Sequence, residues 1–262
     1  STQESPFEAK KIGAALIAKR IAHYIEHDFI DKPKNWNPLI YCWRGGERSG
    51  AFTHILNRIG WKARQLEGGY QGFRRLVIDD LGLYAKQFSF HVICGMTGSG
   101  KTRVLRELKT LGAQVLDLEG LAVHRGSVLG NEPQVDQPSQ KGFETALWNA
   151  LRTLDPSRPV YVESESKKVG GVHVPDALME KIRQGSCIEL RSSTATRVSW
   201  LIREYHHFLI DTDNLKSKLA LLNAHYGKAQ ITKWSEAIDA GQFPQLVEDL
   251  LVKHYDPSYT SS

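Results

Sequence analysis

The sequence predicts an α/β protein with an N-terminal α/β unit, a second α/β unit built on a parallel sheet, and a run of C-terminal helices. Short apolar segments alternate with helical patterns between residues 88 and 190, which is typical of βαβ units. Glycine-rich loops follow two of the apolar segments, and from residue 194 onward apolar residues recur at helical spacing. A length of 262 residues fits about two domains.

The first unit is expected to contain one long helix, one short strand and a second helix. Residues 9–30 carry apolar side chains at helical spacing, and Pro33 and Pro38 lie in the segment that interrupts this pattern. Residues 39–41 predict a short buried strand that leads into a glycine-containing loop. Residues 51–59 predict a helix that ends at Gly60.

The second unit shows the clearer strand and helix pattern. Strands are expected over residues 88–94, 114–118, 159–162 and 187–190, and a helix over 102–111. These elements place a partial first domain at residues 1–85, a parallel-sheet α/β domain at 86–193 and a helical region at 194–262.

Composition excludes several classes of protein. The chain is 41% hydrophobic and 24% charged, with a mean hydropathy of −0.36, which excludes a disordered or low-complexity chain. No apolar run approaches the roughly 20 residues that span a bilayer, and the first residues are too polar for a signal peptide. We therefore expect a soluble, cytoplasmic protein without a membrane partner.

Three cysteines are too few, and too far apart, for a metal or disulfide framework. Cys42, Cys94 and Cys187 form no CxxC pair, so neither a zinc site nor a disulfide network is expected. Cys94 and Cys187 end apolar strands, and the sequence predicts that they are small buried side chains.

Positive charge is concentrated in the first third of the chain. Residues 1–90 carry 14 lysines and arginines against 9 acidic residues, whereas residues 91–262 carry 20 of each. The basic residues are densest between Cys42 and Arg75, which suits a phosphate-bearing partner such as a nucleic acid, although a solvated basic face is an equal alternative.

Residues 95–102 match the pattern G-x-x-x-x-G-K-[ST] between a predicted strand and a predicted helix. In such a loop, glycines let backbone N–H groups surround phosphate oxygens, the lysine neutralises a distal phosphate and the Thr hydroxyl can hold Mg²⁺. The expected phosphate-binding residues are Gly95, Thr97, Gly98, Ser99, Gly100, Lys101 and Thr102.

Polar residues after the next predicted strands are candidates for the phosphate or metal side of this loop. Glu163 closes one strand, and Asp117 and Glu119 follow another. His124 and Arg125 lie in a flexible-looking segment that could cover the phosphate. Solvent exposure is the competing interpretation for all five. Mg²⁺ is therefore possible, and binding of ATP is left open.

A second loop with residues suited to catalysis begins at Cys42. A cysteine that leaves a strand and faces the start of a helix, flanked by Arg44 and Arg48, is expected to have a lowered thiol pKa. The C-x5-R spacing forms an anion-sized ring of amides closed by Arg48. We predict that Cys42, Arg44 and Arg48 are catalytic.

The Cys42 loop, followed by the segment Glu-Gly-Gly-Tyr-Gln-Gly-Phe at 67–73, resembles the second half of a rhodanese domain. The series Cys-Trp-Arg-Gly-Gly-x-Arg-Ser, Gly-Gly-Tyr-x-x-Phe-Arg, the phosphate loop, Leu-Asp-Leu-Glu-Gly-Leu-Ala-x-His-Arg-Gly-Ser and Glu-Ser-Glu-Ser resembles the tRNA 2-selenouridine synthase family. The resemblance covers residues 41–174.

This resemblance implies a transferase that replaces sulfur by selenium on wobble 2-thiouridine of tRNA. In the family, geranyl diphosphate first alkylates the sulfur, and selenophosphate then converts the S-geranyl product into 2-selenouridine. Cys42 would be the rhodanese-type cysteine, acting as selenium carrier or in proton transfer, and residues 95–102 would hold the diphosphate of the prenyl donor. Selenophosphate synthetase is a possible partner.

Two features qualify the expectation. Only one helix and a short strand precede Cys42, so the rhodanese-like domain is expected to be N-terminally incomplete, and the chain could lack selenation activity. The C-terminal helices carry the candidate tRNA-contacting residues Trp200, Arg203, His206, His207 and Lys216, for which simple packing on the α/β core is the alternative.

Three other functions are compatible with the same motifs. A C-x5-R loop also occurs in cysteine-dependent phosphatases, although no general acid for the leaving group stands out here. A phosphate loop also fits a P-loop kinase or ATPase with a regulatory rhodanese module. The third alternative is a tRNA-binding module without catalysis.

Overall fold

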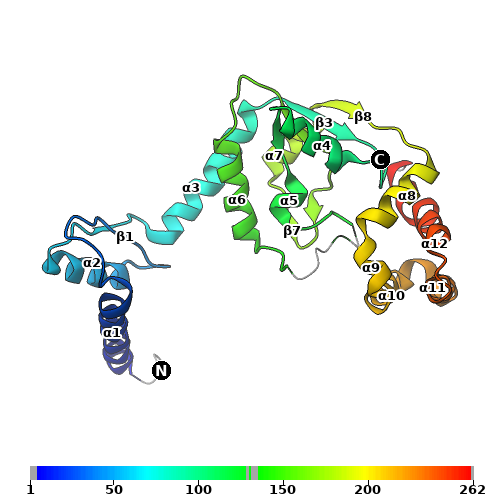
Figure 1. The fold of residues 1–262 in the computed structure, drawn as a ribbon. Helices are drawn as coiled ribbons and strands as arrows, with labels where there is room; N and C mark the ends of the chain where they lie inside the picture. Colours follow the sequence, from blue (N-terminus) through cyan, green and yellow to red (C-terminus); the bar gives the residue numbers. More distant parts are fainter. Residues whose placement is uncertain (1–4, 128–129, 131–134, 261–262) are drawn as a thin grey trace. The chain divides into compact units, whose positions relative to one another are not determined.

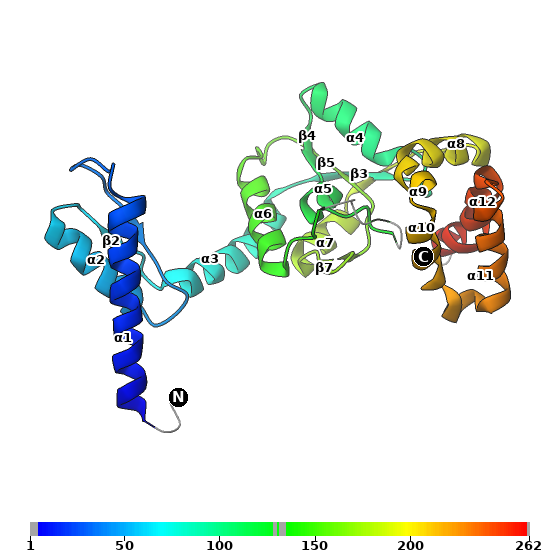
Figure 2. The same ribbon diagram turned by 60° about the horizontal axis from the view of Figure 1, so that its bottom comes forward.

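The computed structural model describes residues 5–127, 130 and 135–260. Across these described residues, no helix combines the length and the apolar character needed to cross a membrane. The chain divides into an N-terminal unit, residues 1–76, and a C-terminal unit, residues 77–262, and each is described by itself (Figures 1 and 2).

The division between the units falls within helix α3 (Gly69–Tyr84), whereas the sequence placed a boundary at residue 85. The second half of α3 belongs to the C-terminal unit because it buries Val77 and Leu81 completely or nearly so. In addition, the Asp80 carboxylate accepts a 2.8 Å hydrogen bond from the Trp148 indole N–H. Because α3 continues through the boundary, a prediction based on where helices end places the boundary too late in the sequence.

The described residues of the N-terminal unit form two short parallel strands and four helical segments. They are α1 (Pro6–His23), η1 (Tyr24–Asp28), β1 (Leu39–Ile40), α2 (Glu47–Ile59), β2 (Arg64–Gln65) and the first half of α3. Strand β1 pairs with β2 in parallel. Gly60, at a φ of 113°, ends α2 as the sequence predicts, since only glycine adopts this conformation without strain.

The predicted burial of residues 39–41 is wrong. Leu39 and Tyr41 are 56% and 60% exposed. In the part of the chain that the structure describes, β1 has β2 as its partner in a two-stranded sheet, and so small a sheet offers little area to cover these side chains.

The C-terminal unit is built on a four-stranded parallel sheet, which confirms the predicted fold class for this part of the chain. Its strands are β3 (Phe90–Cys94), β4 (Gln114–Leu116), β5 (Val160–Glu163) and β8 (Ser186–Glu189), in the order β4-β5-β3-β8. The central strands β3 and β5 are mostly buried apolar runs, as expected for a sheet covered on both faces.

Helices connect these strands. They are α4 (Lys101–Thr110), α5 (Leu118–Ala122), α6 (Gln140–Arg152) and α7 (Asp176–Arg183), and a small hairpin of β6 (Lys168–Val169) and β7 (Val172–His173) precedes α7. Because all four strands run in parallel, the loops after β3, β4 and β5 meet at one edge of the sheet.

The helices after β8 pack around a core of their own. They are α8 (Thr194–Glu204), α9 (His206–Ile210), α10 (Thr212–Ala220), α11 (Asn223–Asp239), α12 (Phe243–Leu250), η3 (Leu251–Tyr255) and α13 (Asp256–Thr260). This core includes Phe208, Leu219, Trp234 and Leu246. Figures 1 and 2 show these yellow-to-red helices beside the loops that follow the sheet strands.

Two predictions about the cysteines are wrong. Cys187 is exposed because β8 is an edge strand, a position that local sequence does not reveal. The structure also joins Cys94 and Cys187 by a disulfide, with Cα atoms 6.0 Å apart. Parallel pairing of β3 with β8 brings together these two residues, which are 93 positions apart in the sequence.

Candidate functional site

The phosphate loop connects β3 to α4 in the C-terminal unit. Gly98 and Gly100 adopt φ values of 79° and 87°, a region that favours glycine. A Cβ atom on Gly98 would lie 2.9 Å from the Leu201 side chain, so α8 packs directly on the loop. Lys101 begins α4, and its Nζ donates a 2.9 Å hydrogen bond to the Gly95 carbonyl. The lysine is therefore held at the loop, where it can reach a phosphate.

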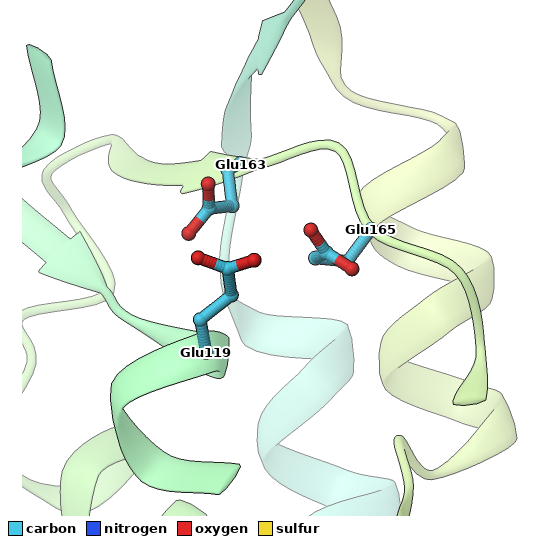
Figure 3. A group of neighbouring side chains, drawn as sticks. All are labelled: Glu119, Glu163 and Glu165. Atoms are coloured by element: carbon cyan, nitrogen blue, oxygen red, sulfur yellow. The ribbon is translucent and has the colours of Figure 1, made fainter. Parts of the chain in front are cut away.

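Three glutamates converge opposite the first turn of α4. Glu163 ends β5, Glu119 lies on α5 and Glu165 follows β5, and carboxylate oxygens of all three lie within 4.8 Å of one another (Figure 3). The Thr102 hydroxyl donates to Glu163 at 3.1 Å, and it lies 3.3 Å from a Glu119 oxygen. The second Glu163 oxygen is buried and has no hydrogen-bond partner among the described residues.

Burial and mutual repulsion raise the pKa of all three carboxyl groups. The pKa of Glu119 and of Glu163 rises to about 8, chiefly through burial and then through a neighbouring carboxylate. The pKa of Glu165 rises to about 7 for the same reasons, and the Lys101 ammonium opposes all three shifts. Carboxylate and hydroxyl oxygens are the ligands that Mg²⁺ prefers, so these residues fit a divalent cation beside bound phosphate.

Raised carboxyl pKa values make the stability of the metal-free C-terminal unit depend on pH. The folded state holds protons that the unfolded state releases near pH 4.5, so this stabilisation is complete below that pH and is lost as the pH rises toward 8. In the presence of a chelator that removes divalent cations, we expect the free energy of unfolding to fall by on the order of 2 kcal/mol between pH 5 and pH 9. This change lowers the melting temperature by about 4–8 °C.

Glu163→Gln is expected to flatten this pH dependence, because one carboxyl group no longer ionises. Added Mg²⁺ should raise the melting temperature of the parent at pH 9 and have little effect on Glu163→Gln. Glu180→Gln, at an exposed position of α7 outside the cavity lining, serves as the matched control. Identical pH profiles for the parent and Glu163→Gln, measured by thermal unfolding, would contradict the assignment.

The phosphate loop and the carboxylates line one cavity of about 1180 Å³. Its lining includes the expected residues Thr97, Gly98, Ser99, Gly100, Lys101, Thr102, Asp117, Glu119, His124, Arg125 and Glu163. The Asp117 carboxylate caps α5 by accepting a hydrogen bond from the Gly120 N–H at 2.8 Å, so at least one of its oxygens serves the fold. Nδ1 of the buried His124 accepts from the Gly126 N–H, and the Arg125 guanidinium lies 4.9 Å from the Tyr205 ring.

The Cys42 loop lies in the N-terminal unit, between β1 and α2. The Ser49 hydroxyl, on the first turn of α2, donates to the Cys42 sulfur at 3.3 Å. The Gln65 amide of β2 donates in turn to the Ser49 oxygen at 2.9 Å. The pKa of the Cys42 thiol is lowered chiefly by the Ser49 hydroxyl and further by backbone hydrogen bonds, with burial opposing the shift.

The glycines of the later Gly-Gly-Tyr segment support this loop. A Cβ atom on Gly69 would lie 2.8 Å from the Cys42 carbonyl oxygen, and the Tyr70 N–H donates to that oxygen at 3.1 Å. The Tyr70 ring stacks on Trp43 at 4.6 Å. The segment therefore fixes the backbone that presents the sulfur, which explains why the two motifs occur together.

Comparisons with known proteins point to one family. A family profile described as "tRNA 2-selenouridine synthase AAA domain" matches residues 88–218. A tRNA 2-selenouridine synthase of Shewanella halifaxensis is 30% identical over 282 aligned positions, which cover 96% of this chain and 75% of that protein. The chain belongs to the tRNA 2-selenouridine synthase family.

Other family members are more similar over shorter stretches. The Alcanivorax borkumensis synthase is 39% identical over 65% of this chain and 46% of its own length, and the Nitrosomonas europaea synthase is 37% identical over 78% and 53%. The chain thus spans about half the length of these curated relatives. A solved DNA replication initiation factor gives a TM-score of 0.25 at 17% identity over 61% of this chain and 62% of that chain, a likeness from which nothing follows.

Within this synthase-family chain, the cause of the Cys42 activation differs from the expected one. Arg44 and Arg48 are exposed residues of the loop and of the first turn of α2. Hydrogen bonds from Ser49 and the backbone, rather than the guanidinium charges, lower the Cys42 pKa. Ser49 was visible in the motif, but its role required the fold of the loop.

Ser49→Ala is expected to make Cys42 less reactive, because the alanine cannot stabilise the thiolate. Cys94 and Cys187 are bonded to each other, so thiol alkylation reports on Cys42. We expect the rate of iodoacetamide labelling at pH 7 to fall about threefold or more. Thr53→Val, on the same helix, should leave the rate unchanged, and an unchanged rate in Ser49→Ala would contradict the assignment.

The candidate tRNA-contacting residues have different surroundings. The guanidinium groups of Arg103 and Arg203 each lie 5.4 Å from the centre of the Trp200 ring. Lys216 forms an ion pair with Asp239, and the His207 ring packs on Phe208. His206 is exposed. A cationic and aromatic edge therefore remains around Trp200, beside the phosphate loop.

The site also contains residues that sequence reasoning missed. Glu165 completes the carboxylate cluster, and the Glu-Ser-Glu-Ser segment was a signal for it. Arg197 of α8 is 2% exposed and donates to the Thr97 carbonyl at 2.9 Å. Its guanidinium also binds both carboxylate oxygens of Asp256, at 3.1 and 2.5 Å. This pair fastens the start of α13 to the phosphate loop.

Proposed function

We propose that this chain converts wobble 2-thiouridine of tRNA into 2-selenouridine in two steps, acting in the cytoplasm. In the first step, the thiouridine sulfur bonds to C1 of geranyl diphosphate while the C1–oxygen bond breaks and diphosphate leaves. In the second, selenium from selenophosphate adds at ring carbon 2 and geranyl thiol leaves. Hydrolysis of the selenium–phosphorus bond then releases phosphate.

The observation that carries this proposal is the phosphate loop facing the carboxylate cluster within one cavity. Lys101 and the N–H groups at the start of α4 are suited to neutralising the diphosphate as it leaves. Thr102, Glu119, Glu163 and Glu165 would hold Mg²⁺, which supplies further positive charge to the leaving group when bound.

The Cys42 loop is proposed to serve the selenium step. A thiol with a lowered pKa on an exposed loop is prepared for nucleophilic or proton-transfer chemistry. We propose that the N-terminal unit is part of a rhodanese-like domain, that Arg44 and Arg48 attract the anionic selenium donor, and that selenophosphate synthetase is a possible source of that donor. The edge around Trp200 and Arg203 is proposed to contact tRNA.

The test is a single incubation with tRNA that contains 2-thiouridine, geranyl diphosphate, selenophosphate and Mg²⁺. Digested nucleosides are then analysed by mass spectrometry, and 2-selenouridine is the expected product. Absence of any modified nucleoside would overturn the proposal. Rapid hydrolysis of an aryl phosphate that is lost in Cys42→Ser would then indicate a phosphatase, and turnover of ATP without tRNA would indicate a kinase or ATPase.

A further inference from the structure

The cavity at the phosphate loop is much larger than a diphosphate requires. Its volume of about 1180 Å³ exceeds the usual size range of ligand pockets, roughly 300–1,000 Å³. Its polar end consists of the phosphate loop and the carboxylates already described. Most of the remaining wall comes from α8, α9, α12 and η3, and this part of the cavity needs a separate explanation.

The wall contributed by these helices is mainly apolar. Leu201 of α8, Leu209 of α9 and Val247 of α12 are half-buried residues that line it. Phe208, Leu246 and Leu250 also line it; they are at most 5% exposed and belong to the core of the C-terminal helices. A polar portion of a ligand would gain little binding free energy from contact with such a wall. An apolar portion would gain binding free energy, because the contact removes it from water.

The apolar wall begins directly at the phosphate loop. The contact between Leu201 and Gly98, described above, leaves no polar layer between the two at this point. Arg197 holds α8 to the Thr97 carbonyl, so this juxtaposition is fixed by a buried hydrogen bond. A ligand whose phosphate occupies the loop would therefore place its next atoms against leucine side chains.

We propose that the apolar part of the cavity binds the hydrocarbon chain of the prenyl diphosphate, and that Val247 and Leu209 help to set the chain length that is accepted. This inference rests on the proposed function and extends it from the diphosphate head to the tail. An anionic head joined to an apolar chain matches both the polar end and the apolar end of the cavity. Inorganic diphosphate matches only the polar end.

Isothermal titration with a series of diphosphates tests this inference on the parent chain, without tRNA and with Mg²⁺ present. The series is inorganic diphosphate, dimethylallyl diphosphate, geranyl diphosphate and farnesyl diphosphate, with ADP as the nucleotide comparison. Each buried CH₂ group adds up to about fourfold in affinity. Geranyl diphosphate has five more carbons than dimethylallyl diphosphate. We expect it to bind at least about 30-fold more tightly, which is less than the full burial of five carbons would give.

A matched pair of variants locates the chain. Val247→Phe places a larger side chain in the apolar part of the cavity. It should weaken the binding of geranyl diphosphate at least about tenfold relative to the binding of inorganic diphosphate. Val252→Phe makes the same change at a position that is 55% exposed and outside the cavity lining, and it should have no such effect. The chain-length series on the parent decides the question even if Val247→Phe does not fold.

The outcomes separate this inference from the function on which it rests. Equal affinity for geranyl and inorganic diphosphate, with geranyl transfer to tRNA still observed, would overturn the tail site and leave the proposed function intact. Absence of both binding and transfer would overturn the proposed function itself. Tighter binding of ADP than of geranyl diphosphate would assign the cavity to a nucleotide and overturn the tail site.

Discussion

Lys101→Ala is expected to slow geranyl transfer to 2-thiouridine by at least about 100-fold, which corresponds to about 2.7 kcal/mol of lost transition-state stabilisation. Lys101 donates a hydrogen bond to the Gly95 carbonyl of the phosphate loop, and it also offsets the charge of the three buried carboxylates. Charge develops on the diphosphate as the carbon–oxygen bond breaks, so removal of the cation affects the transition state more than the bound substrate.

Initial rates of S-geranyl-2-thiouridine formation, measured with saturating tRNA, provide this comparison. Lys109→Ala is the matched control, because Lys109 lies on the same helix but is exposed and outside the cavity lining. A Lys101→Ala variant that binds more weakly but transfers at the parent maximal rate would show that the lysine serves binding alone. That result would remove Lys101 from the catalytic step.

Arg197→Met is expected to destabilise the C-terminal unit by about 3–5 kcal/mol. Arg197 is almost completely buried, and its guanidinium joins the Thr97 carbonyl of the phosphate loop to Asp256 of α13. Removal of one partner of a buried ion pair leaves the other without compensation, which accounts for the size of the effect. Asp256→Asn should be destabilising for the same reason.

Thermal unfolding measures this effect, with an expected decrease in melting temperature of roughly 6–20 °C for a unit of this size. Arg191→Met provides the control, because Arg191 pairs with Glu189 on an exposed surface, where an ion pair adds little stability. Equal melting temperatures of Arg197→Met and the parent would show that α13 is not fastened to the phosphate loop by this pair.

Local patterns were enough to predict most of the C-terminal unit. The strands at β3, β4, β5 and β8 and the helix after the phosphate loop follow from apolar runs and glycine positions. Strand order is a tertiary property, and for that reason the edge position of β8 and the exposure of Cys187 were missed. The division within α3 was missed because the helix continues through it.

The candidate site shows the same limit. Lys101, Thr102 and Glu163 were predicted because a motif or a strand end marks them. Arg197 and Asp256 are 59 residues apart, and nothing in the local sequence indicates that they meet. The apolar wall of the cavity likewise comes from helices whose apolar stripes, by sequence alone, indicate only packing.

The central claim is that the two loops serve successive steps, with the phosphate loop for geranyl transfer and Cys42 for selenation. The most direct measurement is the nucleoside composition of tRNA after incubation of the parent, Cys42→Ser and Lys101→Ala with geranyl diphosphate and selenophosphate. We predict 2-selenouridine from the parent, accumulated S-geranyl-2-thiouridine from Cys42→Ser, and unmodified 2-thiouridine from Lys101→Ala. Full selenation by Cys42→Ser, or geranylation by Lys101→Ala at the parent rate, would contradict the account.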